Sequence, residues 1–192
     1  MLDLGGKTAL ERCVERVQQF RGISEIIIAT STEVQDDVVV RMARHLGVGF
    51  YRGSHQDVLR RYTEAAREIQ ADAIVRCTSD CPLLDPEVSS LVIKQFLESH
   101  VDYLSNTLER RFPKGLDTEI FSMQALEKAN HDAQELDERE HVTLHMYRNL
   151  DKFLCKQLVM EGVLDRSHIR WTLDTLEDYC FLSSIFQKNN NV

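Results

Sequence analysis

The stretch A-I-V-R-C-T-S-D-C-P-L-L-D-P-E, residues 73–87, decides the fold. Its first six residues are mostly apolar or β-branched, which predicts a short buried strand over residues 73–78. The chain must leave the sheet soon afterwards, because the next proline has no N–H group for a strand ladder. Asp85 and Pro86 are typical of a helix N-cap and a first helical position. Asp80 therefore lies at the carboxyl end of a strand, where open α/β sheets bind their ligands.

Composition limits the class of protein. A chain of 192 residues with 43% hydrophobic and 28% charged residues is typical of one soluble globular domain. The net charge of −8 argues against binding to a nucleic-acid backbone, although a local cationic pocket for a nucleotide remains compatible with it. The sequence has no apolar run of membrane length and no signal-peptide pattern. Five scattered cysteines fit reduced thiols, so we expect a cytoplasmic protein.

Outward from the opening stretch, apolar spacing predicts strands and helices in alternation. The first half should hold helices near residues 9–20, 34–46, 55–70 and 86–98, and strands near 25–30, 48–51 and 73–78. Gly47 is expected as a left-handed helix C-cap. Strands that alternate with helices over short connections predict a mostly parallel sheet with right-handed crossovers.

The second half of the sequence is less regular. Candidate strands cover residues 102–104, 118–121, 154–159 and 170–173, and candidate helices cover residues 123–131, 138–147 and 176–188. The run Asn189–Asn191 is typical of a frayed chain end.

Two aspartates come directly after predicted strands, Asp80 in C-T-S-D and Asp174 in R-W-T-L-D. Only the fold can bring them together, because they lie far apart in the sequence. Two carboxylates that converge at a sheet edge suit Mg²⁺, which keeps several waters and substrate oxygens as ligands. The alternative is that each aspartate caps the next helix in the chain, and on these residues alone capping is the simpler interpretation.

Small and polar residues end two other predicted strands. Ala29 and Thr30 end one of them, and Arg52 and Gly53 end the next. Glycine lets a backbone approach a ligand closely, and a hydroxyl there is able to read a base edge. A plain turn is the alternative at both places.

A histidine pair and a cysteine pair give weaker signals. His141 and His145 have the i, i+4 spacing that can bind Zn²⁺ on a helix, but the glutamate of an HExxH motif and a third ligand are both lacking. Cys77 and Cys81 are expected to pack in the core.

Seven blocks in a consistent order carry a family resemblance. They are I-I-I-A-T (26–30), R-G-S-x-x-D-V-L-x-R-Y (52–62), V-R-C-T-S-D-C-P-L-L-D-P (75–86), D-Y-L-S-N-T (102–107), F-P-K-G-L-D-T-E-I-F (112–121), R-E-H-V-T (139–143) and R-W-T-L-D-T-L-E-D (170–178). Together they resemble the cytidylyltransferases that activate acidic sugars, the acylneuraminate type included, and most closely the spore-coat-polysaccharide branch.

The resemblance implies a fold and a reaction. The fold would be an α/β, Rossmann-like nucleotidyltransferase sheet in one domain, with a nucleotide-binding half over residues 1–100 and a sugar-binding half over 101–192. The reaction would transfer CMP from CTP to a sugar acid with Mg²⁺ and release pyrophosphate, for surface or spore-coat polysaccharide biosynthesis. The partners would be CTP and a sugar acid, and whether the protein forms a homodimer stays open.

The resemblance also implies roles for individual residues. Asp80 and Asp174 would be the catalytic carboxylates that bind Mg²⁺. The nucleotide would contact Ala29, Thr30, Arg52, Gly53, Asp57 and Thr78. The sugar acid would contact Asn106, Lys114, Asp117, Glu119, Arg139, His141 and Arg170.

The sequence departs from the family pattern at its start. The family opens with a strand and a Gly- and Arg-containing phosphate loop, whereas residues 2–7 match the segment that comes after that loop. The opening strand would lie between residues 26–29 and 74–77, so we expect an open position in the sheet there. Without the loop, activity of this form is in doubt.

Three hypotheses are compatible with the sequence. The first is a sugar-acid cytidylyltransferase, the second a non-catalytic module that binds nucleotides or partners, and the third a glycosyltransferase that uses a nucleotide-sugar. Release of pyrophosphate separates the first from the other two.

Overall fold

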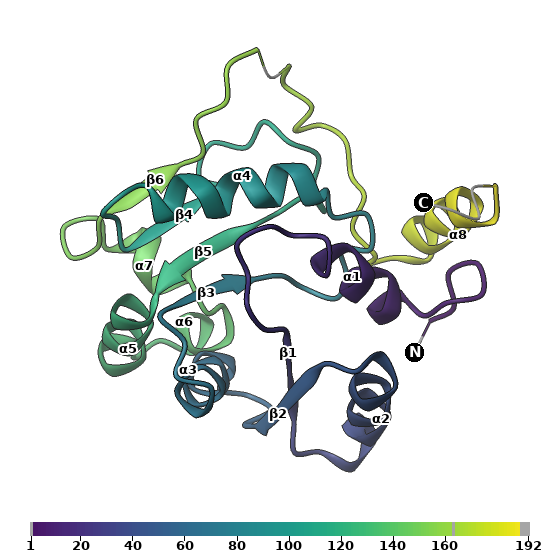
Figure 1. The fold of residues 1–192 in the computed structure, drawn as a ribbon, viewed down its shortest axis with the longest axis horizontal. Helices are drawn as coiled ribbons and strands as arrows, with labels where there is room; N and C mark the ends of the chain where they lie inside the picture. The colour runs from purple at the N-terminus through teal and green to yellow at the C-terminus, as the bar shows by residue number, and fades with distance from the viewer. Residues whose placement is uncertain (1, 163, 189–192) are drawn as a thin grey trace.

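The computed structural model describes residues 2–162 and 164–188, which form an α/β fold (Figure 1). The strands are β1 (Ile27–Ser31), β2 (Gly49–Gly53), β3 (Ala73–Arg76), β4 (Tyr103–Ser105), β5 (Glu119–Ser122) and β6 (Cys155–Gln157). The helices are α1 (Ala9–Val17), η1 (Val34–Asp36), α2 (Asp37–Leu46), α3 (Val58–Glu68), α4 (Pro86–Leu97), α5 (Met123–Asp132), α6 (Leu136–Glu140), α7 (Leu144–Arg148) and α8 (Leu176–Lys188).

The strands form two separate sheets. β1 and β2 pair in parallel, and the second sheet has the order β3-β5-β4-β6. In the second sheet β5 is antiparallel to both neighbours, whereas β4 and β6 are parallel. No ladder joins β1 to β3 in the part of the chain that the structure describes, which agrees with the open position expected between them.

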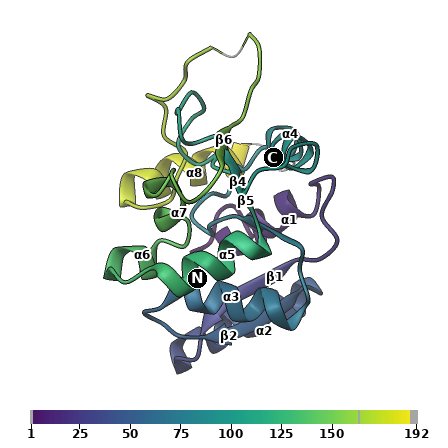
Figure 2. The ribbon, with the colours of Figure 1, turned by 90° about the vertical axis from the view of Figure 1, so that its left-hand side faces the viewer.

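Helices cover both faces of the four-stranded sheet. Successive side chains of a strand point to opposite sides, so neighbouring residues enter two different hydrophobic clusters. Tyr103 and Phe121 are fully buried in a cluster with residues of α3, α5 and α7. Leu104 and Ile120 come next to them in the same strands and are buried on the other face, against α4. Figures 1 and 2 show α4 on one side of the sheet and α3 and α5 on the other.

Two helix ends form as their sequences predict. The Asp85 carboxylate accepts hydrogen bonds from the N–H groups of Glu87 and Val88, so it caps α4, with Pro86 as the first helical residue. Gly47 ends α2 in the left-handed conformation, with φ of 68°.

The single helix predicted over residues 138–147 is wrong. The structure has two short helices, α6 and α7, separated at residues 141–143. At this break Val142 is fully buried, and the Thr143 hydroxyl donates a hydrogen bond to Glu119 on β5. This long-range contact turns the backbone away from the helical path that the local pattern favours.

The helix predicted near residues 34–46 also differs from the structure in its first turn. Residues of η1 form a 3-10 turn before α2 begins. The Asp36 carboxylate accepts hydrogen bonds from the backbone N–H and the hydroxyl of Ser31, which draws this turn toward the end of β1.

The strand predicted over residues 170–173 is wrong, because only an isolated parallel bridge between Lys114 and Arg170 forms there. The backbones approach closely at this bridge, and the Trp171 N–H donates to the Lys114 carbonyl at 2.7 Å. Gly115 permits this approach, since a Cβ at that position would lie 2.8 Å from the Trp171 carbonyl carbon.

α8 packs against the start of the chain. Leu4, Leu182 and Phe186 are buried together, and the Arg12 guanidinium lies 4.4 Å from the Phe186 ring centre. The predicted frayed end, Asn189–Asn191, lies outside the described residues. Among the described helices, none has both the length and the apolar character needed to cross a membrane.

Gly115→Ala should lower the free energy of unfolding by about 2–5 kcal/mol, the sum of two terms. The loss combines the cost of positive φ, ~1–2 kcal/mol, with the clash against the Trp171 backbone, ~1–3 kcal/mol. Gly47→Ala is the matched control, because its φ is also positive but nothing lies within 4 Å of the added Cβ. Urea denaturation of both variants measures the difference, and equal losses would contradict the close approach.

Candidate active site

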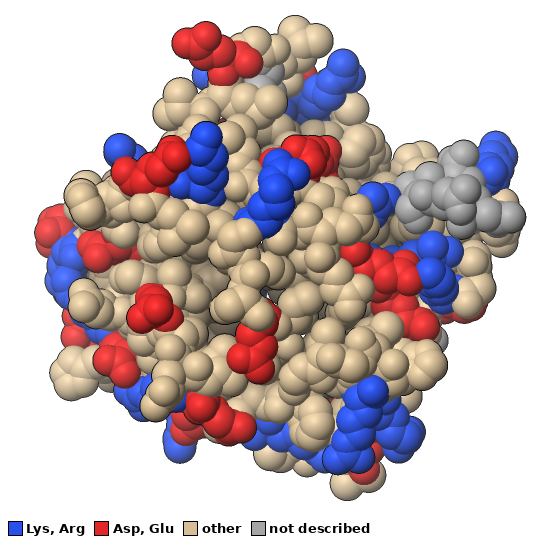
Figure 3. Space-filling model, viewed as in Figure 1, with Lys and Arg blue, Asp and Glu red and all other residues tan. Residues whose placement is uncertain are grey.

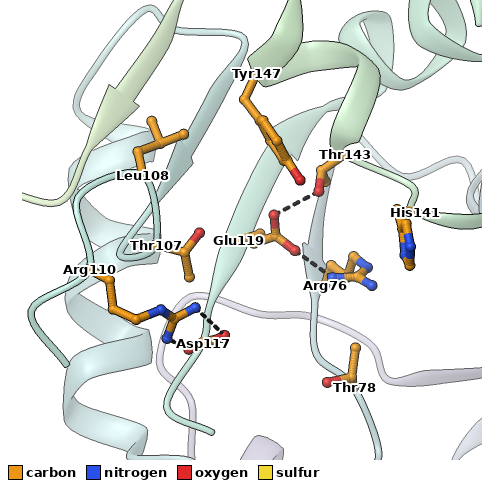
Figure 4. Close-up of a pocket in the computed structure, with 10 residues that line it drawn as sticks. All are labelled: Arg76, Thr78, Thr107, Leu108, Arg110, Asp117, Glu119, His141, Thr143 and Tyr147. Carbon is orange, nitrogen blue, oxygen red and sulfur yellow. Dashed lines mark hydrogen bonds and ion pairs between the residues drawn. The ribbon is translucent and has the colours of Figure 1, made fainter. Parts of the chain in front are cut away.

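A polar pocket of about 390 Å³ lies at the carboxyl ends of β3 and β4 and the amino end of β5 (Figure 4). This is the edge at which open α/β sheets bind ligands. Its walls come from β3 and β5, from the segment after β4, and from the α6–α7 break. The lining residues are Arg76, Thr78, Thr107, Leu108, Arg110, Asp117, Glu119, His141, Thr143 and Tyr147.

Glu119 is the centre of a buried hydrogen-bond network. It lies directly opposite Arg76 in the β3–β5 register, and its Oε2 accepts from the Arg76 guanidinium at 2.5 Å. Its Oε1 accepts from the Tyr103 hydroxyl at 2.6 Å and from the Thr143 hydroxyl at 2.7 Å. The carboxylate therefore links β3, β4, β5 and the α6–α7 break, which fixes the floor of the pocket.

Burial and charge set the protonation states in this network. Burial disfavours the charged form of Arg76, but the facing Glu119 carboxylate outweighs it and raises the guanidinium pKa above its usual value. Burial, followed by the Glu119 charge, raises the pKa of Tyr103, so its hydroxyl stays a hydrogen-bond donor. The pKa of Tyr147 is raised for the same reasons.

A second ion pair forms one wall. Arg110 donates to both carboxylate oxygens of Asp117, at 2.6 and 2.8 Å, and both side chains remain partly exposed. The pocket thus contains two arginines and two carboxylates. The charges of these four side chains balance, and together with several hydroxyl groups they make the pocket polar.

Four predicted site residues meet in this pocket, namely Thr78, Asp117, Glu119 and His141. Sequence reasoning missed Arg76, Thr107, Leu108, Arg110, Thr143 and Tyr147. A signal for three of them existed, because Arg76, Thr107 and Thr143 lie inside motifs that carried the family resemblance.

The structure brings the two aspartate segments together. The Leu173 N–H donates to the Asp80 carbonyl at 2.8 Å, which places the residue before Asp174 against the end of β3. Asp80 does not cap α4, because Asp85 does. The capping interpretation of Asp80 is therefore wrong.

Asp174 is not the cap of α8 either. Thr175 and Asp178 exchange hydrogen bonds there, from the Thr175 N–H to the Asp178 carboxylate and from the Asp178 N–H to the Thr175 hydroxyl. Asp174 instead pairs with the exposed Arg170 at 2.8 Å, and Arg170 also contacts Asp178.

The residues predicted for the nucleotide lie mostly away from the pocket. Thr30 donates to the Asp36 carboxylate, and Ala29 and Thr30 line a different cavity, between β1 and β3. The Arg52 guanidinium donates to the Ser31 and Glu33 carbonyls and to Asp37.

Gly53 is a packing position beside Arg52. A Cβ at Gly53 would lie 2.9 Å from the Arg61 side chain, so the absent side chain makes room for Arg61. The nucleotide contacts expected of Arg52 and Gly53 stay predictions.

Two residues assigned to different substrates bind each other. Arg139, expected at the sugar, donates to both oxygens of Asp57, expected at the nucleotide, at 3.0 and 2.6 Å. The Asp57 carboxylate also accepts from the Arg60 N–H as the cap of α3. This pair joins α3 to α6 outside the pocket.

The remaining sugar-side candidates also lie outside the pocket. Asn106 is buried and bonds to the Leu116 carbonyl and the Thr118 N–H, which makes it a support for the loop before β5. Lys114 is exposed near Arg170.

The cysteines near the site are protonated at neutral pH. Burial raises the pKa of Cys13 and of Cys77 to about 12, and it raises that of Cys81 further. A thiolate nucleophile is therefore absent at these three positions.

The two histidines of the i, i+4 pair do not share a helix. His141 lies in the α6–α7 break, whereas His145 lies in α7, where its Nδ1 contacts Glu138 at 2.9 Å. Within the described ranges no group of three or more His, Cys, Asp or Glu side chains is placed to hold a metal ion. A metal ion at Asp80 and Asp174 would thus need oxygens from water and substrate as well.

A sequence model of the family described as "Cytidylyltransferase" matches residues 1–191. The chain belongs to the cytidylyltransferase family. It is therefore a nucleotidyltransferase, and its α/β fold is the fold of that family.

Individual relatives agree. The chain is 32% identical to the structure of a cytidylyltransferase from Leptospira borgpetersenii, with a TM-score of 0.87 over 98% of this chain and 87% of that one. It is 36% identical to the uncharacterized protein MJ1063 of Methanocaldococcus jannaschii, over 93% of this chain and 72% of the relative. The spore coat polysaccharide biosynthesis protein SpsF of Bacillus subtilis is 28% identical over 96% of this chain and 78% of the relative.

Removing the central carboxylate of this cytidylyltransferase should destabilise it. Glu119→Ala leaves Arg76 without its ion-pair partner, which should lower the free energy of unfolding by about 3 kcal/mol. Glu87→Ala is the control, because it breaks an exposed pair with Arg21 and should change stability little. Urea denaturation compares the two, and equal effects would show that the Glu119 network does not support the fold.

Proposed function

We propose that the protein transfers CMP from CTP to a sugar acid in a Mg²⁺-dependent reaction and releases pyrophosphate. The observation that carries this proposal is the contact between the segments of Asp80 and Asp174 at the carboxyl end of β3, beside a polar pocket. Membership of the cytidylyltransferase family supports CTP as the donor. The name of the relative SpsF supports a role in surface polysaccharide synthesis.

The two carboxylates fit a magnesium ion by their chemistry. Mg²⁺ prefers oxygen ligands, and one or two carboxylates suffice when substrate phosphates supply the others. When bound there, the ion would neutralise charge on the phosphate oxygens of CTP. Apart from a long contact from the Cys81 thiol at 3.6 Å, no hydrogen bond to the Asp80 carboxylate is seen among the described residues.

The pocket residues would bind and orient the sugar acid. Arg110 and Arg76 supply positive charge for its carboxylate, while Asp117 accepts hydrogen bonds from sugar hydroxyls and the Thr107 hydroxyl donates to them. His141 borders the same pocket. The other residues assigned by resemblance, at β1, β2 and the start of α3, would contact the nucleotide.

The reaction needs positioning more than covalent catalysis. The sugar hydroxyl attacks the α-phosphorus of CTP in line, a new oxygen–phosphorus bond forms, and the α–β phosphoanhydride bond breaks to release pyrophosphate. The hydroxyl proton passes to solvent or to a nearby base. A protein nucleophile is not required, which fits the protonated cysteines around β3.

Asp80→Asn should reduce Mg²⁺-dependent binding of CTP and lower pyrophosphate release by about 100-fold, because an amide cannot supply the ligand charge. Its melting temperature should stay near that of the parent protein. Asp85→Asn is the matched control, since asparagine caps a helix as well as aspartate does. Isothermal titration with Mg²⁺·CTP and a pyrophosphate assay measure both effects.

The same assays separate the other hypotheses. Unchanged CTP binding in Asp80→Asn would contradict the metal assignment. If the parent protein binds CTP but releases no pyrophosphate with a panel of sugar acids, the non-catalytic alternative is favoured. Glycosyl transfer from a nucleotide-sugar without pyrophosphate would favour the glycosyltransferase alternative.

Arg110→Gln should raise the KM for the sugar acid by about 10-fold or more and leave the KM for CTP unchanged. A charge-assisted hydrogen bond to a carboxylate contributes ~1.5–3 kcal/mol, which corresponds to this range. Arg111→Gln is the control, because this exposed neighbour does not line the pocket. Equal KM values for Arg110→Gln and Arg111→Gln would remove Arg110 from the sugar site.

A further inference from the structure

Arg61 on α3 is a partly buried arginine that forms no ion pair with a carboxylate in the described part of the chain. Most Lys and Arg side chains on the face in Figure 3, by contrast, lie beside an Asp or Glu side chain. The Arg61 side chain makes one hydrogen bond, from Nη1 to the Ser54 carbonyl at 2.7 Å. Its Nε is buried and has no partner. A positive charge is therefore held in the fold with most of its five N–H donors unused.

The carboxylates around Arg61 are bound to other groups. Asp57, four residues before it, pairs with α6 and caps α3. Glu64, three residues after it, accepts from Arg60 at 2.7 Å. The Asp36 charge also acts on Arg61, but this carboxylate accepts hydrogen bonds from the residues that end β1. The protein thus supplies three acidic groups to this region and pairs none of them with the Arg61 guanidinium.

The cost of this arrangement is visible in the protonation equilibrium of Arg61. Burial lowers its pKa, and the charges of Tyr62 and Asp36 offset only part of that effect. The neighbouring Arg60 shows the opposite, because its hydrogen bond to Glu64 raises its pKa. Arginine stays protonated in both situations. The Arg61 charge is therefore present and is not compensated by an ion pair within the described residues.

Arg61 lies at the carboxyl ends of β1 and β2. These strands are parallel, with Ser31 opposite Gly53, so both end at the same edge of their sheet. The stem of Arg61 fills the space beside Gly53, where a Cβ would lie 2.9 Å from it. Its tip is held by the Ser54 carbonyl in the turn that leaves β2. The guanidinium is thus fixed at the kind of edge where open α/β sheets bind ligands.

A second arginine faces the same region. Arg76 and Arg61 both line the cavity between β1 and β3, and the Nε of Arg76 is also buried without a partner. Burial raises the pKa of Tyr62, and the charges of Arg76 and Arg61 both oppose this rise, so the two guanidinium groups act on one ring. Glu119 compensates Arg76. The region consequently has one positive charge in excess, and it is that of Arg61.

A phosphate-type oxyanion matches these groups. Its charge offsets that of Arg61, and its oxygens accept charge-assisted hydrogen bonds from guanidinium N–H groups. A tetrahedral phosphate presents oxygens to two arginines on different elements, whereas a planar carboxylate faces one guanidinium at a time. A neutral ligand would leave the buried charge uncompensated.

We propose that Arg61 anchors a binding site for a phosphate-type oxyanion at the carboxyl ends of β1 and β2. The Arg61 guanidinium donates to the anion, and Arg76 borders the site. Arg61 does not line the polar pocket, so this site is separate from the one proposed for the sugar acid. The anion is either a phosphate group of a nucleotide, a source that rests on the proposed function, or free inorganic phosphate or pyrophosphate.

The test titrates inorganic pyrophosphate into the full chain without Mg²⁺, by isothermal titration and by melting temperature. Arg61→Met keeps an apolar stem and removes the charge, so it should weaken pyrophosphate binding by at least 10-fold. Without the anion its melting temperature should equal or exceed that of the parent protein, because the uncompensated charge is gone. Arg60→Met is the matched control, since it removes one charge from an exposed neighbour and should keep the parent affinity.

The proposal is overturned if the parent protein binds no pyrophosphate, if Arg61→Met keeps the parent affinity, or if Arg60→Met loses as much. A second measurement does not depend on how a variant folds. In NMR spectra of the parent protein, pyrophosphate should shift the Nε–H signal of Arg61 and leave that of Arg60 in place. An unchanged Arg61 signal would also overturn the proposal.

Competition identifies the source of the anion. If CTP without Mg²⁺ displaces pyrophosphate, the site holds a phosphate group of the nucleotide. If pyrophosphate stays bound beside CTP, the site holds a free anion. None of these measurements uses Mg²⁺ or nucleotide transfer, so failure of this proposal and failure of the proposed function are distinguishable.

Discussion

The ion pair between Arg76 and Glu119 supports both the sheet and the pocket. The two residues face each other across β3 and β5, so the charges are held at the position where the sheet meets the ligand edge. Burying two charges is costly unless their remaining hydrogen-bonding capacity is met. Tyr103 and Thr143 meet it on the Glu119 side, and in doing so they fix β4 and the α6–α7 break to the same carboxylate. The shape of the pocket therefore depends on how one buried charge is satisfied.

Local signals predicted much of the fold. Helix caps depend on neighbours a few residues away, and for this reason Asp85 and Gly47 were predicted correctly from the sequence. The helix break at residues 141–143 was not predicted correctly. Its cause is a contact between Thr143 and Glu119, which is distant in the sequence and lies on β5. The strand predicted at residues 170–173 is absent for a related reason: its backbone groups make single hydrogen bonds to Lys114 and Asp80 and do not form a ladder.

The site was predicted in part, and strand pairing explains the difference. The family motifs contained Arg76 and Thr143, but their pattern alone does not tell which side chains face the pocket. That depends on the β3–β5 register and on the path of the chain after α6. Several chosen residues have partners within the protein that no motif reveals, such as Asp57 with Arg139. For Asp80 and Asp174 the structure shows that their segments meet through a backbone contact at Leu173, and their shared metal site stays a prediction.

The cavity between β1 and β3 shares a wall with the polar pocket, because Arg76 and Thr78 line both. Among the described residues β3 forms a ladder only with β5, so the strand that holds Arg76 opposite Glu119 has one unpaired edge there. A strand with one open edge is held less firmly than a central one. The pairing with β5 is therefore the main restraint on the part of β3 that leads to Asp80. The β3–β5 pairing and the shape of the candidate site are thus one physical problem, because both depend on the end of β3.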